Sequence, residues 1–416
     1  MSDDSTTQCL LFPGIFRKPI VAQFDQREGS SDGGALLLKA ADRHYVLVAG
    51  LRSCLRDARQ AGKVDHSLRE LVGQRVFSIA CGYPDANDSA RLSEDPIHKL
   101  LLDRDPIDGR DLASQPTLSR FENGVGVKEL YRSGEFLAES VIRRHAQRLR
   151  HRAYRVTIDL DPTDDPTHGA QQLSFFNGHY DTWCYLPVMG FVSFNDEAEQ
   201  YLCAAVLRPG NVTAAVGAVA MLRRLVRMIR HHIPGVRIRV RLDGGFAHPA
   251  VLEFLAESVI RRHAKRLRHR TYRVTIDLDP TDDPTHGAQQ LSFFNGHYDT
   301  WCYLPVMGFV SFNDEAEQYL CAAVLRPGNV GAAVGAVAML RRLLRMIRYH
   351  LPGVQIRVRL DGGFAHPALL QFLDAQPKLE YVVAMAKNAV LKRVAESGMR
   401  RARQLSRRRA GHFPAL

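Results

Sequence analysis

The spacing of hydrophobic positions predicts that the first 134 residues are mainly helical. Apolar side chains recur at helical intervals over residues 34–42, 66–80 and 129–152. Glycine, proline, aspartate and asparagine separate these segments, most densely over residues 82–87. We therefore expect a helical N-terminal domain.

A different pattern begins at residue 155 and predicts strands. Residues 155–161 form a β-rich run that ends at a proline, and further strands are expected at 183–194 and 201–207. A helix with apolar spacing is expected at 214–229, and residues 236–242 alternate Val, Ile and Leu with Arg. This β-β-β-α-β order predicts an α/β fold with a mixed-sheet core.

The same segment occurs twice in the chain. Residues 135–252 are repeated as residues 253–370, a period of 118 residues with eight differences. Solenoid units are shorter and more diverged, because each unit needs a neighbour to complete its core. A near-identical unit of domain size instead indicates a recent duplication of coding DNA, in the gene or in its assembly.

The chain continues differently after each of the two copies. After the second copy the pattern predicts a further helix at 367–373 and a strand at 381–385, whereas the first copy runs directly into a helix at 254–268. We predict that the second copy forms the better-packed core and that the first leaves a sheet edge exposed. The expected domains are residues 1–134 (helical), 135–252 and 253–390 (the two core copies) and 391–416 (a basic C-terminal segment).

Composition narrows the class of protein. Hydrophobic residues make up 45% of the chain and charged residues 24%, which is typical of globular proteins. No apolar stretch predicts a membrane span, and the acidic, polar start does not resemble a secretion signal, so we expect a cytoplasmic protein. The cysteines lack close pairs and predict reduced thiols. They are Cys9, Cys54, Cys81, Cys184, Cys203, Cys302 and Cys321.

An excess of basic residues changes the expected partner. The formal net charge is +12, and arginine is concentrated in runs at 143–145, 148–152 and 400–409. Such an excess attracts polyanions, of which nucleic acid is the commonest. The alternative for any single run is a solvated basic face of a helix.

Aspartates at the ends of predicted strands are the main candidates for chemistry. Asp159 and Asp161 share a face of the first strand, and Asp243 ends the fourth. If those strands are neighbours, Asp161 and Asp243 meet at one edge, where Mg²⁺ or Mn²⁺ would offset their repulsion. Two such ions could support in-line attack on a phosphodiester. The alternative is that these aspartates only form turns, as aspartate before proline or glycine commonly does.

Other features leave alternatives open. His168 and His179 could serve as ligands or bases, but a histidine beside glycine is more often a turn residue. Aromatic side chains could stack on bases or fill the core. They are Phe175, Phe176, Tyr180, Trp183 and Tyr185. The chain has no phosphate-binding loop and no nucleophile elbow, so no nucleotide cofactor is expected.

Several motifs together carry a resemblance to a known family. In the core they are IDLDPTDDPTHG (158–169), QLSFFNGHYD (172–181), LRPGN (207–211), RLDGGF (241–246) and EYVVAMAKN (380–388). Towards the N-terminus they are SSDGG (30–34), HSLREL (66–71), GYPDAND (82–88) and QPTLSRFEN (115–123). The chain resembles DDE transposases of bacterial insertion sequences, specifically the insertion-sequence-1380 group, over residues 10–405.

The resemblance implies a fold, a reaction and its residues. The fold would be a helical N-terminal domain that holds the terminal inverted repeats, followed by a ribonuclease-H-like core with a β-rich insertion. Asp161 and Asp243 would be catalytic, as would Asp279 and Asp361 in the second copy. The Mg²⁺ or Mn²⁺ ligands would be Asp159, Asp161, Asp243, Asp277, Asp279 and Asp361. The partners would be double-stranded DNA, both inverted repeats and target, and further copies of the chain in a homo-oligomer.

The chain departs from the family pattern at the third carboxylate. The family places a glutamate on a later helix, and Glu380 and Glu396, the glutamates that come after Asp361, lack its setting. We therefore expect a C-terminally truncated core whose cleavage activity is severely weakened. Two alternatives are an inactive DNA-binding remnant that interferes with a full-length enzyme, and a metal-dependent nuclease that uses the aspartate pairs alone.

Overall fold

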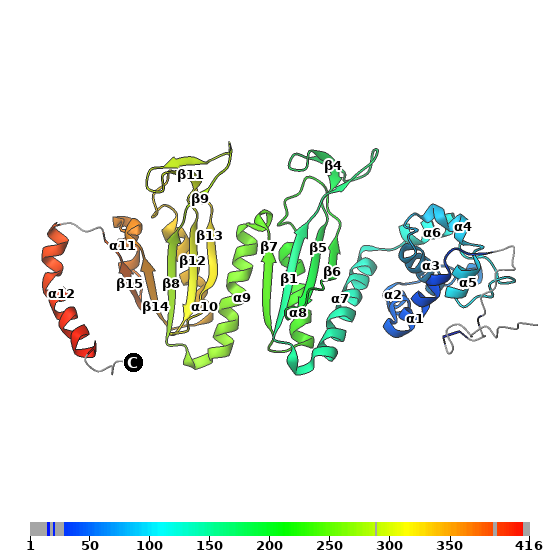
Figure 1. Cartoon of the computed structure of the whole chain (residues 1–416), viewed down its shortest axis with the longest axis horizontal. Coiled ribbons are helices and arrows are strands. Elements are labelled where there is room, and N and C mark those ends of the chain that lie inside the picture. The colour runs from blue at the N-terminus through cyan, green and yellow to red at the C-terminus, as the bar shows by residue number, and fades with distance from the viewer. Residues whose placement is uncertain (1–14, 17–19, 21–28, 288, 386–388, 411–416) are drawn as a thin grey trace, which may run out of the picture. The chain divides into compact units, whose positions relative to one another are not determined.

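The computed structural model describes residues 15–16, 20, 29–287, 289–385 and 389–410. Contacts between Cα atoms divide the chain into two compact units, Met1–Gly245 and Phe246–Leu416 (Figure 1). Cys9, residues 386–388 of the EYVVAMAKN motif and residues 411–416 of the basic segment lie outside the described residues.

Helices form the N-terminal part of the first unit. They are α1 (Leu36–Tyr45), α2 (Leu47–Cys54), α3 (Leu68–Ala80), α4 (Ser89–Leu92), α5 (Pro96–Leu101), α6 (Gln115–Asn123) and α7 (Val127–Leu149). The predicted helices at 34–42, 66–80 and 129–152 correspond to α1, α3 and α7. Ser67 begins α3 with a capping box, in which Ser67 and Glu70 bond each other's backbone N–H groups.

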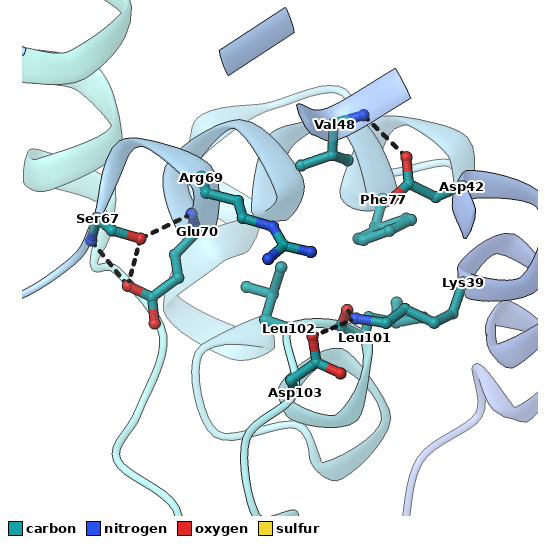
Figure 2. Close-up of a pocket in the computed structure, with 10 residues that line it drawn as sticks. All are labelled: Lys39, Asp42, Val48, Ser67, Arg69, Glu70, Phe77, Leu101, Leu102 and Asp103. Carbon is teal, nitrogen blue, oxygen red and sulfur yellow. Dashed lines mark hydrogen bonds and ion pairs between the residues drawn. The ribbon is translucent and has the colours of Figure 1, made fainter. Parts of the chain in front are cut away.

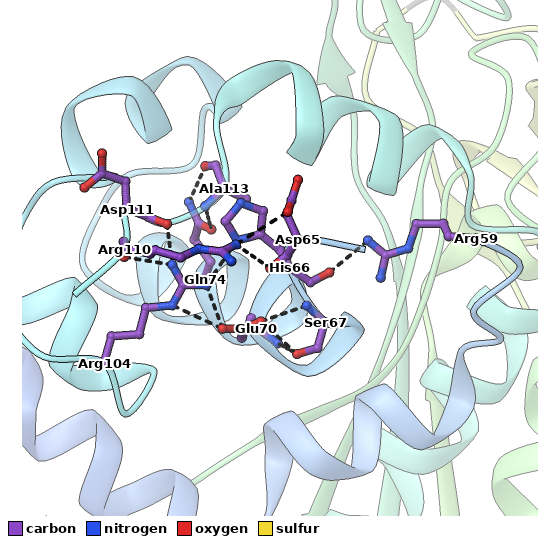
Figure 3. A network of polar contacts seen from close by, with 10 residues as sticks. All are labelled: Arg59, Asp65, His66, Ser67, Glu70, Gln74, Arg104, Arg110, Asp111 and Ala113. Carbon is purple, nitrogen blue, oxygen red and sulfur yellow. Dashed lines mark hydrogen bonds and ion pairs between the residues drawn. The ribbon is translucent and has the colours of Figure 1, made fainter. Parts of the chain in front are cut away.

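Polar contacts fix the loops of this helical region. The Arg104 guanidinium donates to Glu70 Oε1 over 2.7 Å and lies 3.1 Å from His66 Nδ1 (Figure 3). The Gln74 amide bonds both the N–H and the carbonyl of Ala113. Beside them is a pocket, where the buried Lys39 ammonium lies 2.9 Å from Asp103 Oδ2 (Figure 2). The buried side chains of Lys39 and Gln74 are thereby partnered, which makes their burial tolerable.

The first unit continues into a four-stranded mixed sheet. Its strands are β1 (Arg155–Pro162), β5 (Val188–Phe194), β6 (Tyr201–Val206) and β7 (Arg237–Leu242), in the order β6-β5-β1-β7. β1 is antiparallel to β5 and parallel to β7. Helix α8 (Ala218–His232) buries Leu222, Leu225 and Ile229. This arrangement is consistent with a ribonuclease-H-like core.

The second unit repeats this sheet and adds a strand. The strands are β8 (Arg273–Pro280), β12 (Val306–Phe312), β13 (Tyr319–Val324), β14 (Gln355–Leu360) and β15 (Leu379–Val383), in the order β13-β12-β8-β14-β15. Its helices are α9 (Pro249–Leu267), α10 (Ala336–His350), α11 (Pro367–Asp374) and α12 (Ala389–Ala410). The predicted helix and strand at 367–373 and 381–385 are α11 and β15.

Helix α9 joins, in one continuous helix, two segments that correspond to two different helices of the chain. Its start corresponds in sequence to α11, which comes after β14 in the second copy, and its end corresponds to α7, which precedes β1. The predicted boundaries after residues 134 and 252 therefore lie inside the helices α7 and α9.

Identical residues of β7 and β14 differ in burial, and β14 has the neighbouring strand β15 and the helix α11 in its hydrophobic cluster. β15 pairs in parallel with β14, and Ile356, Val358 and Leu360 of β14 are buried. In the first unit, β7 pairs with β1, and its counterparts Ile238, Val240 and Leu242 are only half-buried. Among the described residues, β7 pairs with no second strand. The predicted exposed sheet edge of the first copy is confirmed.

A small three-stranded sheet accompanies each large one. In the first unit it contains β2 (Asp165–Pro166), β4 (Thr182–Tyr185) and β3 (Phe175–Asn177), and in the second β9 (Asp283–Pro284), β11 (Thr300–Tyr303) and β10 (Phe293–Asn295). Figure 1 shows β4 and β11 beyond one end of the large sheets. The prediction of one strand at 183–194 is wrong, because β4 and β5 belong to different sheets. Pro187, which has no N–H for a ladder, lies between them.

The cysteines carry no disulfide in the described residues. Cys54, Cys81, Cys184, Cys203, Cys302 and Cys321 are free, and all except Cys81 are buried. This confirms the predicted thiols at these six positions.

Candidate metal-binding carboxylates

The strand register brings the predicted aspartates together. Leu160 of β1 pairs with Leu242 of β7 in parallel, so Asp161 and Asp243, the next residue of each, emerge side by side at the carboxyl ends of neighbouring strands. In the second unit Leu278 pairs with Leu360 and places Asp279 and Asp361 in the same way. All four are exposed. The condition set by the sequence, that the first and fourth strands be neighbours, is therefore met in both copies.

A tyrosine lies close to each pair. Partial burial, and then the negative charges of Asp164, Asp243 and Asp161, raise the pKa of Tyr180 above its usual range. Tyr298 has the same surroundings in the second unit. A tyrosine with a raised pKa stays protonated at neutral pH, so its hydroxyl can donate a hydrogen bond to a carboxylate or a phosphate oxygen.

The second aspartate of each pair also forms a turn. Asp243 Oδ1 accepts a hydrogen bond from the Gly245 N–H over 2.9 Å, as Asp361 does from Gly363. A side chain at residue 245 would approach Ala214 Cβ to 3.1 Å, which explains the second glycine of the RLDGGF motif. The turn engages one oxygen, and within the described residues Oδ2 of Asp243 makes no hydrogen bond, so turn formation and metal binding are compatible.

A buried arginine supports the neighbouring loop. Arg208, of the LRPGN motif, donates to the carbonyl oxygens of Leu186, Thr213, Ala214 and Val216. Burial lowers the pKa of its guanidinium. Arg326 makes the equivalent bonds in the second unit. The LRPGN motif therefore fixes the connection between β6 and α8, next to the turn at Gly245.

The family model described as transposase DDE domain group 1 matches residues 12–262 and again residues 255–412. The chain belongs to this family. Among curated proteins, none matches the chain. Membership supports a role as a DDE-type transposase, implies that the chain binds DNA, and accords with a divalent metal ion, which the family generally uses.

In this transposase the remaining predicted metal ligands, Asp159 and Asp277, form ion pairs with arginines. Both oxygens of Asp159 contact the guanidinium of Arg241, its register partner on β7, with 2.8 Å between Oδ2 and Nη2. Asp277 and Arg359 form the same pair in the second unit. In this structure Asp159 and Asp277 are ion-pair partners, and their service as metal ligands stays a prediction.

No third carboxylate completes either aspartate pair in the described part of the transposase. Glu380, on β15, lies 2.6 Å from Arg357 Nε, and Glu396 lies 3.1 Å from Arg400 within α12. Of the described residues, neither aspartate pair belongs to a group of three side chains able to hold a metal. Within the described residues, each aspartate pair therefore lacks a third ligand side chain close enough to join it.

The aromatic side chains of the small sheet are not core residues. Trp183 is 59% exposed and Phe176 is 49% exposed, and their rings meet edge to face. Trp301 and Phe294 repeat this arrangement. The alternative that the aromatics fill the core is wrong for Phe175, Phe176 and Trp183, whereas Tyr180 and Tyr185 are half-buried. Stacking on bases stays a prediction. His168 and His179 are both exposed, and His179 lies in the turn after β3.

No described helix is long and apolar enough to cross a membrane.

Proposed function

We propose that this transposase cleaves and transfers DNA strands at the terminal inverted repeats of an insertion sequence of the insertion-sequence-1380 group, with much reduced activity. The observation that carries the proposal is the parallel pairing of β1 with β7, which aligns Asp161 with Asp243. Asp279 and Asp361 repeat it. Paired carboxylates at strand ends, with a protonated tyrosine beside them, suit the handling of a phosphodiester.

The donor set suits Mg²⁺ or Mn²⁺. Asp161 and Asp243 offer hard carboxylate oxygens, and their negative charge is large enough to help raise the pKa of Tyr180. Bound ions would activate the attacking oxygen and stabilise the leaving one. The protein's own contribution is to hold the carboxylates on a rigid sheet end and to present the Tyr180 hydroxyl to the scissile phosphate.

The weakened activity follows from the ligand count. Glu380 is engaged by Arg357, and among the described residues no third ligand side chain lies close enough to complete either aspartate pair. Fewer ligands hold a metal pair less firmly and position it less accurately. An inactive DNA-binding form that occupies element ends and interferes with a full-length enzyme is the second candidate.

Cleavage of a terminal-repeat duplex by the purified chain in Mn²⁺ tests the proposal. We expect a trace of strand cleavage that disappears when Asp161→Asn, Asp243→Asn, Asp279→Asn and Asp361→Asn are combined. Pairwise variants in one copy identify which sheet is active. The control Glu199→Gln removes an exposed acid elsewhere and should leave cleavage unchanged.

DNA binding separates the two candidates. Salt-sensitive, sequence-preferring binding without any cleavage would favour the inactive, interfering form. Cleavage that ignores sequence would instead indicate a nuclease using the aspartate pairs alone. Sedimentation with paired repeat duplexes would show whether the chain acts as a homo-oligomer.

The repeat itself has a proposed origin in duplicated coding DNA. The family model matches twice, and the second match starts inside the repeated segment. A long-read sequence across the locus tests this origin, and a single copy of residues 135–252 there would contradict it.

A further inference from the structure

Three side chains of types that commonly bind metals meet in the helical region, in the part of the chain that precedes both sheets. Asp32 comes directly before the short turn η1 (Gly33–Ala35), Cys81 ends α3, and His98 lies on α5. One ligand atom from each lies within 4.8 Å of the other two. Among the described residues, this is the one group of three such side chains that meets this limit.

The cluster is built into the fold. His98 is 2% exposed, and its Nε2 lies 3.0 Å from Asp32 Oδ2. The Tyr83 hydroxyl donates to the other oxygen of Asp32 over 3.1 Å, and the Arg91 guanidinium lies over the Tyr83 ring. The Asp32 carboxylate and the His98 imidazole therefore already face each other, and His98 is buried. An acid on the solvated surface would not have such surroundings.

The surroundings shift the pKa values of Asp32 and Cys81 in opposite directions. Burial opposes the ionisation of Asp32, but hydrogen bonds from His98 and Tyr83 outweigh it and lower the pKa of Asp32. Burial, with the negative charges of Asp32 and Asp95, raises the pKa of the Cys81 thiol. A divalent ion would reverse this second effect, because it binds the thiolate and releases the proton.

We propose that Asp32, Cys81 and His98 bind one Zn²⁺ ion. Carboxylate, thiolate and imidazole together are the ligands of a borderline-soft ion and not of Mg²⁺. Zinc bonds of about 2.0 to 2.3 Å require the widest-spaced ligand atoms to draw in by up to about 1 Å, and water would take the fourth position. The site is distinct from the aspartate pairs in place and in chemistry.

Such an ion would have a structural effect on the helical region. Asp32, Cys81 and His98 come from three segments that are separated in sequence, and one ion bonded to all three would join them. The competing explanation is that Asp32 and His98 form only a buried hydrogen-bonded pair and that Cys81 is a bystander. The two explanations differ in whether the sulfur bonds the metal.

Cobalt titration of the full chain distinguishes them, because a cobalt–thiolate bond gives a charge-transfer band that oxygen ligands do not. We expect one Co²⁺ per chain with this band, displaced by Zn²⁺ but not by Mg²⁺. Cys81→Ala should abolish the band and weaken cobalt binding at this site by at least the ~10-fold that loss of an outer-shell partner costs. Cys54→Ala, a buried cysteine on α2, should retain the band.

Thermal unfolding supplies a second measurement that does not depend on the band. Zn²⁺ should raise the melting temperature of the native chain and of Cys54→Ala, and should leave that of Cys81→Ala unchanged. Asp32→Asn, which preserves the shape of the side chain, should weaken cobalt binding while leaving the helical circular dichroism intact. Absence of the thiolate band in the native chain, or an undiminished band in Cys81→Ala, would overturn the proposal.

Discussion

The side-chain amide of Asn177 donates to the carbonyl oxygen of Gly210 over 2.7 Å and so joins the small sheet to the loop between β6 and α8. Asn295 and Gly328 form the same bond in the second unit. Because Tyr180 lies in the turn that comes after β3, this junction determines where the tyrosine stands relative to Asp161 and Asp243.

Adding a methyl group at this junction should disrupt it. A Cβ on residue 210 would lie 2.1 Å from the Cys184 carbonyl oxygen, and residue 328 would meet Cys302 equally closely. We expect Gly210→Ala with Gly328→Ala to destabilise the small sheets by about 1–3 kcal/mol and to reduce strand cleavage. Fluorescence reports this unfolding directly, because the two tryptophans of the chain, Trp183 and Trp301, both lie in the small sheets.

The same turn offers a matched control for that experiment. A Cβ on Gly178 or Gly296 would meet nothing within 4 Å. Gly178→Ala with Gly296→Ala should change stability by less than about 0.5 kcal/mol. Equal shifts in the two double variants would show that the close approach at residue 210 is unimportant.

DNA should quench the tryptophans if they stack on bases. Trp183 and Trp301 are more than half exposed on the middle strands of the small sheets. We expect addition of single-stranded DNA to reduce their fluorescence, and Trp183→Ala with Trp301→Ala to weaken binding by about 1–3 kcal/mol per stacked base. Leu173→Ala with Leu291→Ala removes exposed apolar side chains from the same region and should leave affinity near that of the native chain. Unchanged fluorescence at saturating DNA would argue against stacking.

Acid should destabilise both sheets through two buried histidines. His145 stacks on Phe194 and His263 on Phe312, with 4.3 Å between ring centroids in each pair. Burial, and then the charge of Arg148, lower the pKa of His145, and burial is also the largest cause that lowers the pKa of His263. The unfolded chain therefore takes up protons at a pH where the folded chain does not.

The lowered pKa values of the two histidines determine the direction in which stability changes with pH. A depressed folded-state pKa gives stability that is present above the ordinary value of 6.5 and is lost as the pH falls through the lower, folded-state value. Melting temperatures should decline from about pH 7.5 to about pH 5.5. His145→Gln with His263→Gln should flatten the decline, leaving a remainder from His66, whose pKa burial also lowers. A slope identical to that of the native chain would contradict the assignment.

The aspartate pairs show what the sequence could and could not predict. Asp161 and Asp243 could be named as partners only on condition that their strands are neighbours, because strand order depends on contacts distant in sequence. The sequence indicates Tyr180 only as one of several aromatics able to stack on bases, since nothing local shows that its turn lies near the strand ends. Its position in the QLSFFNGHYD motif was the available signal.

The hydrophobic pattern of the sequence predicted the positions of strands and helices better than it predicted which strands belong to the same sheet. The alternation in residues 155–161 and 236–242 corresponds closely to β1 and β7. The apolar run at 183–194 gives little sign that the chain passes from one sheet to another. Pro187, between β4 and β5, is the residue that indicates a break. The predicted helix at 214–229 begins later, at Ala218, because Gly217 precedes it in a left-handed conformation with φ 81°. Arg208 became recognisable as a buried support only through the four carbonyl groups around it.

The unpaired edge of β7 should make the first sheet the weaker of the two. Within the described part of the chain, its outer N–H and carbonyl groups lack the strand that β15 provides for β14. We expect limited proteolysis to cut residues 135–252 before residues 253–390. Equal or greater resistance of the first copy would count against a stabilising role for β15.

Truncation of one valine in each copy measures the contribution of β15 at a single position. Val358 is fully buried between β8 and β15, whereas its counterpart Val240 is half-buried. Val358→Ala should therefore cost about 2 kcal/mol, from the lost apolar contacts and the cavity left behind, and Val240→Ala about half as much. Trp183→Phe and Trp301→Phe backgrounds leave one tryptophan each, so that fluorescence reports on one unit at a time. Because the two strands are identical over their last five residues, equal losses would mean that β15 adds little to the packing of β14.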